Sequence, residues 1–228
     1  MDKTIKYIKD THSLLKEVKE TLFHGKNVFI QDPLPTHVSL ELVLNKVESL
    51  VPRFLVYNID VVYVGNFDYF KKRNINAMYN SGALYISNEQ DDEYDMVDDI
   101  VHEISHAAEE KYQPEIYGDD KLKEEFLNKR KKLYEILKSY DYNVDYNSFM
   151  SVEYEEEFDN LLYKEIGYEK LEFFTMNLFP NNYSITSLRE YFGTGFEKYF
   201  LEDRGALANI SPILFSKVER LANLAEEW

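Results

Sequence analysis

The stretch Asp95-Met-Val-Asp-Asp-Ile-Val-His-Glu-Ile-Ser-His-Ala-Ala108 decides how this chain is expected to fold. Its apolar residues recur at helical spacing, and no glycine or proline occurs between Asp91 and Tyr112, so it predicts a buried helix. Within it, His102, Glu103 and His106 spell H-E-x-x-H. Residues four apart share one helical face, where two imidazoles can bind one zinc ion. Glu103 can then reach a water beside that ion.

The composition excludes several classes of protein. The chain has 228 residues and a hydrophobic fraction of 44%, which is enough for one domain with a sizeable core. Its net charge of −16 argues against binding to nucleic acid, whose phosphates such a surface repels. No apolar run approaches the length needed to span a membrane, so membrane insertion is not expected. Cysteine is absent, so His, Asp or Glu must bind any metal.

No signal peptide is visible, because the N-terminus leads straight into a charged segment. We therefore expect a cytoplasmic protein, or one exported by a route that needs no such signal. From Glu89 to Glu110 the chain has ten acidic residues and no basic one. Most of this charge is expected on a solvated helix face and at a helix N-terminus, and a less favoured interpretation is an acidic rim that attracts a basic peptide. The oligomeric state is left open by the sequence.

The order of the predicted elements indicates an α+β fold in a single domain, residues 1–228. The first lobe, residues 1–90, is expected to combine helices with a small mixed sheet. The second lobe, residues 91–228, is expected to be mostly helical, with the zinc cleft between the two lobes.

The individual elements follow from apolar periodicity and from turn residues. In the first lobe we expect helices at 3–23 and 39–50, strands at 27–30, 54–64 and 82–87, and a connection at 74–80. In the second lobe we expect helices at about 121–140, two or three more between 145 and 179, and then helices at 186–201 and 212–228.

A third zinc ligand is needed, since a catalytic zinc usually has three protein ligands. The residues after His106 lack the glycine and third histidine of the metzincin pattern, and no histidine follows them. A glutamate on a later helix is therefore expected. Two regions compete for the role: residues 151–158, with four glutamates, and residues 183–197, which include Glu190.

Two glycines mark the second of these regions. Gly193 and Gly195 lie inside a predicted helix, where each costs about 1 kcal/mol relative to alanine. Such a cost is easiest to explain if this helix must approach another helix closely. We therefore expect it to lie beside the H-E-x-x-H helix.

The two motifs together resemble a known family. Ile-Val-H-E-x-x-H, followed by Y-x6-E-Y-F-x-x-G-F from Tyr183 to Phe196, is similar to the catalytic domains of anthrax lethal factor and of the clostridial Pro-Pro endopeptidases. The resemblance implies a zincin-like zinc metalloendopeptidase that acts on a protein or peptide. It implies one Zn²⁺ bound by His102, His106 and Glu190, with Tyr183 pointing into the site. Where lethal factor has a further glutamate one turn after its ligand, this chain has Thr194.

The expected roles follow from this set. Glu103 is expected to act as general base, and Tyr183 to donate a hydrogen bond to the oxyanion. Asp98 or Asp99 could accept a hydrogen bond from a ligand imidazole, although favourable charge at the helix N-terminus is the preferred interpretation of each. The strand at 82–87 is expected to be an edge strand that pairs with an extended peptide, with the substrate-binding residues Gly82, Ala83, Leu84, Tyr85 and Ile86.

Two other functions compete with a general endopeptidase. One is a regulatory protease that cleaves a single dedicated partner by the same chemistry. The other is a binding module that keeps the zincin fold without activity. The intact Glu103 disfavours the binding module, because a protein without activity has no need of a general base.

Overall fold

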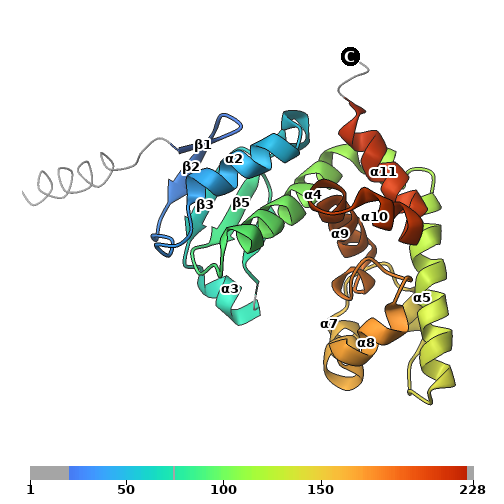
Figure 1. Cartoon of the computed structure of the whole chain (residues 1–228). Helices are drawn as coiled ribbons and strands as arrows, with labels where there is room; N and C mark the ends of the chain where they lie inside the picture. The colour runs from blue at the N-terminus through green and yellow to red at the C-terminus, as the bar shows by residue number, and fades with distance from the viewer. Residues whose placement is uncertain (1–20, 74, 225–228) are drawn as a thin grey trace, which may run out of the picture.

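The computed structural model describes residues 21–73 and 75–224 as an α+β protein. A five-stranded mixed sheet near the N-terminus is followed by a mostly helical region, as the sequence predicts (Figure 1). Most of the helix predicted at 3–23 lies outside the described residues. Its last three residues were assigned wrongly, because Thr21–Phe23 form strand β1.

The sheet has the order β1-β2-β3-β5-β4. Its three central strands run parallel, namely β2 (Lys26–Ile30), β3 (Val61–Gly65) and β5 (Ala83–Ser87). The outer strands β1 and β4 (Ala77–Asn80) pair antiparallel with their neighbours. The strands predicted at 27–30 and 82–87 are confirmed.

The edge of the sheet differs from the prediction. β5 pairs with β3 on one side and with β4 on the other, so residues 82–87 do not form an edge strand. The segment 74–80, predicted as a connection, contains the edge strand β4 instead. Because both edges of β5 are already hydrogen-bonded within the sheet, no further peptide can pair with it.

The strand predicted at 54–64 is only partly present. Arg53–Val56 forms the short helix η1, and β3 begins at Val61. β-Branched and aromatic residues favour a strand, but Leu55 and Val56 are buried through η1 before the chain enters the sheet.

Two helices lie on one face of the sheet (Figure 1). Helix α2 (Leu40–Leu50) begins as predicted at Ser39, whose side chain accepts a hydrogen bond from the Leu42 N–H. Helix α4 (Glu93–Tyr117) contains the H-E-x-x-H motif and is capped by the Asp92 side chain. It continues through Pro114, with a kink at Tyr112, and ends before Gly118.

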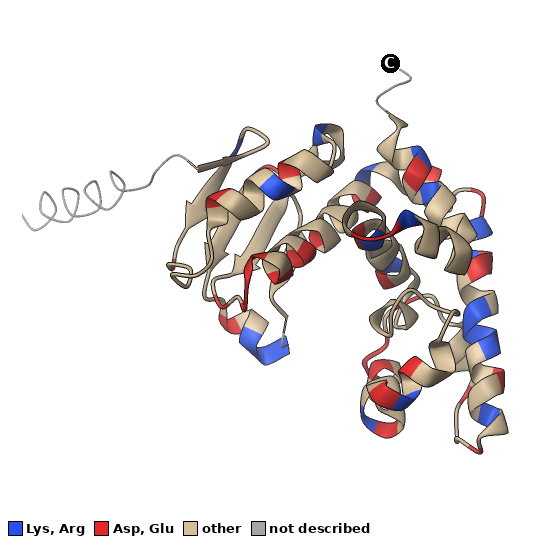
Figure 2. Cartoon of the chain, viewed as in Figure 1, with Lys and Arg blue, Asp and Glu red and all other residues tan. Residues whose placement is uncertain are grey.

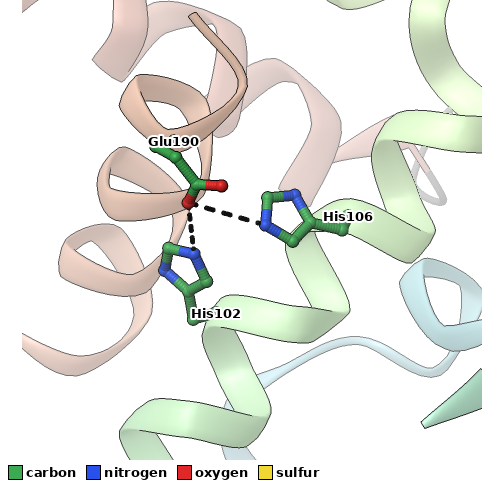
Figure 3. Close-up of side chains that lie close together, drawn as sticks. All are labelled: His102, His106 and Glu190. Atoms are coloured by element: carbon green, nitrogen blue, oxygen red, sulfur yellow. Dashed lines mark hydrogen bonds and ion pairs between the residues drawn. The ribbon is translucent and has the colours of Figure 1, made fainter. Parts of the chain in front are cut away.

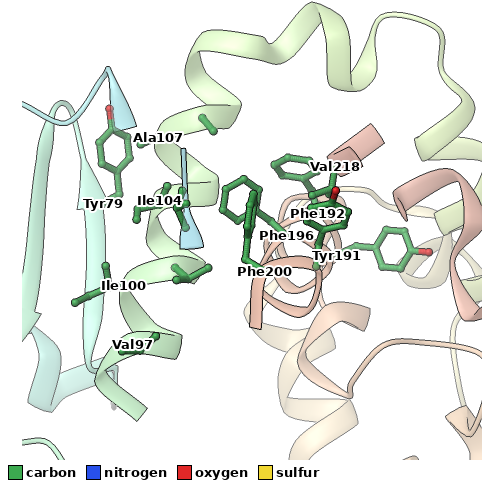
Figure 4. Packing of buried hydrophobic residues seen from close by; sticks show 14 of the residues in the cluster. Tyr79, Val97, Ile100, Ile104, Ala107, Tyr191, Phe192, Phe196, Phe200 and Val218 are labelled. Atoms are coloured by element: carbon green, nitrogen blue, oxygen red, sulfur yellow. The ribbon is translucent and has the colours of Figure 1, made fainter. Parts of the chain in front are cut away.

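Helix α4 lies between the sheet and a later helix (Figure 4). Its residues Ile100 and Ile104 are fully buried. Across from the sheet, α4 packs against α9 (Leu188–Leu201), which contributes the buried rings of Phe192 and Phe196. This packing on both sides fixes the helix that carries both histidines.

Most of the remaining helices lie in the second part of the chain, after α4. Helix α9 begins at Ser187 as predicted, and α10 was not expected from the sequence. No helix among the described residues is long and apolar enough to cross a membrane. The other helical segments are α3 (Asp68–Arg73), α5 (Lys121–Ser139), α6 (Tyr146–Met150), α7 (Glu156–Asn160), η2 (Leu161–Ile166), α8 (Tyr168–Thr175), η3 (Tyr183–Ile185), α10 (Arg204–Ile210) and α11 (Pro212–Ala222).

Candidate metal centre

Helices α4 and α9 bring together two imidazoles and one carboxylate (Figure 3). Glu190 Oε2 lies 2.9 Å from His102 Nε2 and 3.7 Å from His106 Nε2. The three potential ligand atoms lie within 4.8 Å of one another. His106 is buried, and His102 and Glu190 are largely buried. These three residues form a group that could hold a metal ion.

The donor set fits a zinc ion. Zinc bonds of about 2.1 Å place the ligand atoms of a tetrahedral site about 3.4 Å apart. The distances of 2.9 and 3.7 Å lie on either side of that value. Two imidazoles and one carboxylate also form a common donor set of catalytic zinc sites, which leave a fourth position open.

Gly193 permits the close approach of α9 to α4. A Cβ atom at this position would lie 2.9 Å from His102 Cε1 and 3.1 Å from Ser105 Oγ. Any side chain here would therefore press on a ligand imidazole. A Cβ at Gly195 would instead lie 2.4 Å from Leu214 of α11. Only the first glycine thus serves the approach to the H-E-x-x-H helix that the sequence predicts.

The second nitrogen of His102 also has a carboxylate partner. Glu197 Oε2 lies 3.2 Å from His102 Nδ1. Burial opposes the charged form of His102, but the hydrogen bonds to Glu190 and Glu197 outweigh it and raise the pKa of His102 to about 10. The surrounding carboxylates therefore favour a positive charge at this point, as expected of a cation site.

His106 is oriented by a separate group of polar side chains. Its Nδ1 atom lies 3.4 Å from Glu109 Oε2 and 3.1 Å from Arg189 Nε. Glu109 is itself held by the Tyr117 hydroxyl at 2.6 Å and by Arg189 Nε at 3.3 Å. In this structure Arg189 Nε donates to Nδ1, which is therefore unprotonated. An imidazole that binds metal through Nε2 carries its proton on Nδ1, so metal binding would turn this nitrogen from an acceptor for Arg189 into a donor to Glu109.

Glu103 lies beside the metal group and does not belong to it. Its Oε2 atom accepts a hydrogen bond of 2.6 Å from the backbone N–H of Tyr79 in β4. This bond joins the candidate general base to the edge of the sheet. It also fixes the carboxylate, whose second oxygen has no hydrogen-bond partner among residues 21–73 and 75–224.

Tyr183 lies on the His102 side of the group. The two rings are 6.2 Å apart between centroids, and the phenol is 41% exposed. Partial burial, followed by the charges of Glu190 and Glu103, raises the pKa of Tyr183 well above its ordinary value of 10. Its hydroxyl therefore stays protonated near neutral pH and can donate a hydrogen bond.

The competing ligand region lies apart from this group. The glutamates at 153 and 155–157 are exposed, and the metal-capable group contains none of them.

The chain was compared with models of protein families, with curated proteins and with solved structures. None of them matches it. What can be said of the site therefore rests on its own geometry.

A hollow of about 400 Å³ opens on the His106 side of the group. It is lined at one edge by residues 79–81 and at the other by Glu109, Glu110 and Arg189. The C-terminal end of β4 and the later turns of α4 thus enclose a space next to a candidate ligand.

The sequence interpretation missed the partners of both imidazoles. Asp98 and Asp99, proposed for this role, form no hydrogen bond to either ring, and burial raises the pKa of Asp99 to about 7. Glu197 lies seven residues after Glu190, and Glu109 lies three after His106. Both spacings place a side chain on the helical face of the ligand, so a search along those faces would have found them.

Proposed function

We propose that this protein is a zinc metalloendopeptidase with a zincin-like fold, related to the lethal factor and Pro-Pro endopeptidase family. The observation that carries the proposal is the convergence of four side chains from two helices. His102, His106 and Glu190 could hold one metal ion, and Glu103 lies beside them without being part of the group. A binding module would need the first three and would have no use for the fourth.

The proposed reaction is hydrolysis of a peptide bond. A zinc ion at this site would lower the pKa of a water towards about 7 and polarise the substrate carbonyl. Glu103 takes the proton of the attacking water through its free oxygen and passes it to the leaving amine. Tyr183 donates a hydrogen bond to the oxyanion that develops as the carbonyl is attacked.

Strand β4 takes over the substrate role expected of residues 82–86. In an antiparallel ladder, alternate residues turn their N–H and C=O groups away from the neighbouring strand. The Tyr79 N–H points outwards and donates to Glu103, so the backbone groups left for a substrate at this edge are the Tyr79 C=O and the N–H and C=O of Ala77, beside the candidate base. An extended protein or peptide substrate would pair with this edge, with part of its length over the hollow on the His106 side.

The test measures metal content and cleavage in the same preparation. We expect one zinc ion per chain and cleavage of a mixed peptide library that stops with a chelator and returns with added zinc. Glu190→Ala should lower zinc affinity sharply. Glu153→Ala is the matched control, because this exposed glutamate belongs to the region that competed for the ligand role.

Other outcomes would redirect the proposal. Full zinc retention in Glu190→Ala would remove Glu190 from the ligand set. Stoichiometric zinc without cleavage of any library peptide would favour the binding module. Cleavage restricted to one partner protein would indicate the dedicated regulatory protease.

A further inference from the structure

An exposed arginine with no carboxylate partner in the described part of the chain precedes the edge strand that is proposed to bind the substrate. Arg73 is the last residue of α3 and precedes the edge strand β4, which begins at Ala77. Its side chain is exposed, and its Nη1 donates a hydrogen bond of 2.5 Å to the Tyr69 hydroxyl. The guanidinium lies over the Tyr69 ring, 5.4 Å from the centroid. These contacts hold the cation in one place.

Among the described residues Arg73 has no carboxylate partner, although acidic residues outnumber basic ones in this molecule. The chain has 42 acidic and 26 basic residues, and Figure 2 shows acidic residues along the nearby α4. Lys71, two residues earlier, forms an ion pair of 3.0 Å with Glu89, and Arg189 forms one of 3.3 Å with Glu109. Within residues 21–73 and 75–224, no carboxylate lies within 4.0 Å of the Arg73 guanidinium.

Tyrosines from the helical part of the chain lie near this cation. The hydrogen bond to Tyr69 raises the pKa of Arg73, and Tyr154 and Tyr183 are close enough to contribute. Tyr154 and Tyr183 are 42% and 41% exposed. The guanidinium thus faces solvent against the Tyr69 ring, and the candidate oxyanion donor Tyr183 is close enough to affect its pKa.

The direction of β4 relates Arg73 to one half of a bound peptide. Arg73 precedes the N-terminal end of β4, whereas Tyr79 and Asn80 at its other end line the hollow beside Glu109. A peptide that pairs antiparallel with β4 runs in the opposite direction, so its N-terminal half lies over the hollow and its C-terminal half near Arg73. Antiparallel pairing is favoured because it is slightly more stable per residue.

We propose that Arg73 binds a carboxylate of the substrate on the C-terminal side of the cleaved bond. The carboxylate is either an Asp or Glu side chain or the free C-terminus of the peptide. A guanidinium binds either form by two parallel N–H···O bonds. This inference rests on the proposed peptidase function, and it makes Arg73 a specificity-determining residue.

The experiment uses the full-length zinc-loaded protein and peptides chosen from the library by mass spectrometry of the products. For one cleaved sequence, each position after the cleaved bond carries Glu in one peptide and Gln in its pair. Each peptide is made with a free C-terminus and with an amide. In one of these pairs, we expect kcat/KM for the peptide with the carboxylate to exceed that of its neutral counterpart by about tenfold or more. This ratio corresponds to the free energy of one charge-assisted hydrogen bond. The arm that shows the preference identifies the source of the carboxylate.

The variants assign the preference to Arg73. Arg73→Gln should abolish it and leave cleavage of the neutral peptides unchanged, whereas Arg73→Lys should keep part of it. Lys72→Gln, which removes the same charge from the neighbouring residue, should keep it in full. A preference that survives in Arg73→Gln, or an equal rate for all carboxylate and neutral pairs, would overturn the proposal.

A binding measurement separates this inference from the proposed function. Fluorescence anisotropy with labelled peptides is measured on zinc-loaded Glu103→Gln and on its Arg73→Gln double variant. If this binding depends on the carboxylate and on Arg73 while the parent protein cleaves no peptide, the result would contradict the peptidase function and support the Arg73 site. Cleavage and binding that ignore the carboxylate would support the peptidase and contradict the site. A protein that neither cleaves nor binds peptides would contradict both.

Discussion

The carboxylate of Glu197 lies 3.2 Å from Nδ1 of His102, on the opposite side of the imidazole from Glu190. Both glutamates come from α9 and lie seven residues apart on one helix face. This face therefore contributes the candidate ligand Glu190 and also Glu197, which orients the candidate ligand His102. Helix α4 supplies the equivalent partner for His106 through Glu109. Each imidazole thus has a carboxylate near the nitrogen that faces away from the proposed metal, although His106 Nδ1 accepts its hydrogen bond from Arg189 in this structure.

Removing the Glu197 carboxylate should weaken zinc binding without removing a ligand. Glu197→Ala leaves the His102 Nδ1 proton without an acceptor, so the ring loses both its orientation and part of its basicity. Loss of such a partner typically lowers metal affinity about 10- to 100-fold. Competition with a chromophoric chelator would measure the change in zinc affinity.

The matched control is a glutamate at the end of the same helix. Glu202 pairs with Lys198 at 2.7 Å and makes no contact with either histidine. Glu202→Ala should therefore bind zinc like the parent. Equal zinc affinity in both variants would show that Glu197 does not orient the ligand.

The two glycines of α9 should respond differently to alanine. Gly193→Ala places a methyl group 2.9 Å from His102 Cε1, so the imidazole must move away from Glu190. We expect zinc affinity to fall by about tenfold or more, comparable to the loss of an orienting partner. Gly195→Ala places its methyl group against Leu214 at 2.4 Å, away from the metal group.

Chemical denaturation of the metal-free proteins separates the two effects. Gly195→Ala overpacks the contact between α9 and α11, so its free energy of unfolding should fall by about 1–3 kcal/mol. Its zinc affinity should match that of the parent. If Gly193→Ala instead binds zinc normally, the His102 ring has room to move, and the close approach of the helices is not required for the site.

The features that the sequence predicted well are those with a local signal. The H-E-x-x-H helix follows from the apolar spacing of Val97, Ile100, Val101 and Ile104, all of which are buried. Ser39 and Ser187 begin their helices where capping residues predict. The proximity of Glu190 to the histidines, which lie 88 and 84 residues earlier, was implied by the resemblance to a known family, and no local physical rule predicts it.

The edge of the sheet had no such local signal. β4 is four residues long, and its neighbour β5 has the stronger strand composition, so the central strand was taken for the edge. The order of strands in a sheet depends on which segments pair in the folded chain, and the composition of each segment does not reveal its partners. Arg73 was missed for the same reason, since it approaches Tyr154 and Tyr183 only through the fold.

Glu103→Gln tests the proposed base without changing its contacts. The glutamine amide oxygen can still accept the hydrogen bond from the Tyr79 N–H, so the fold and the zinc content should be retained. The amide cannot take a proton from water, so kcat should fall about 10²- to 10⁴-fold. Zinc analysis and single-turnover cleavage in the same preparation would check both parts. Cleavage near the parent rate would exclude Glu103 as the general base.

Tyr183→Phe tests the proposed oxyanion donor and separates a catalytic role from packing. The phenol is exposed to 41% and has no hydrogen-bond partner within the described residues, so loss of its hydroxyl leaves no buried group unpaired. Melting temperature and zinc affinity should therefore match the parent. Because the raised pKa keeps the hydroxyl protonated, its donor function should not vary near neutral pH.

Loss of one oxyanion donor lowers kcat about 10²- to 10³-fold, and KM should change little because the interaction forms only in the transition state. Tyr154→Phe is the matched control, since this tyrosine is similarly exposed but donates its hydroxyl to Asp159. A decrease of less than about threefold in Tyr183→Phe, far below that range, would assign Tyr183 to packing and would leave oxyanion stabilisation to the metal alone.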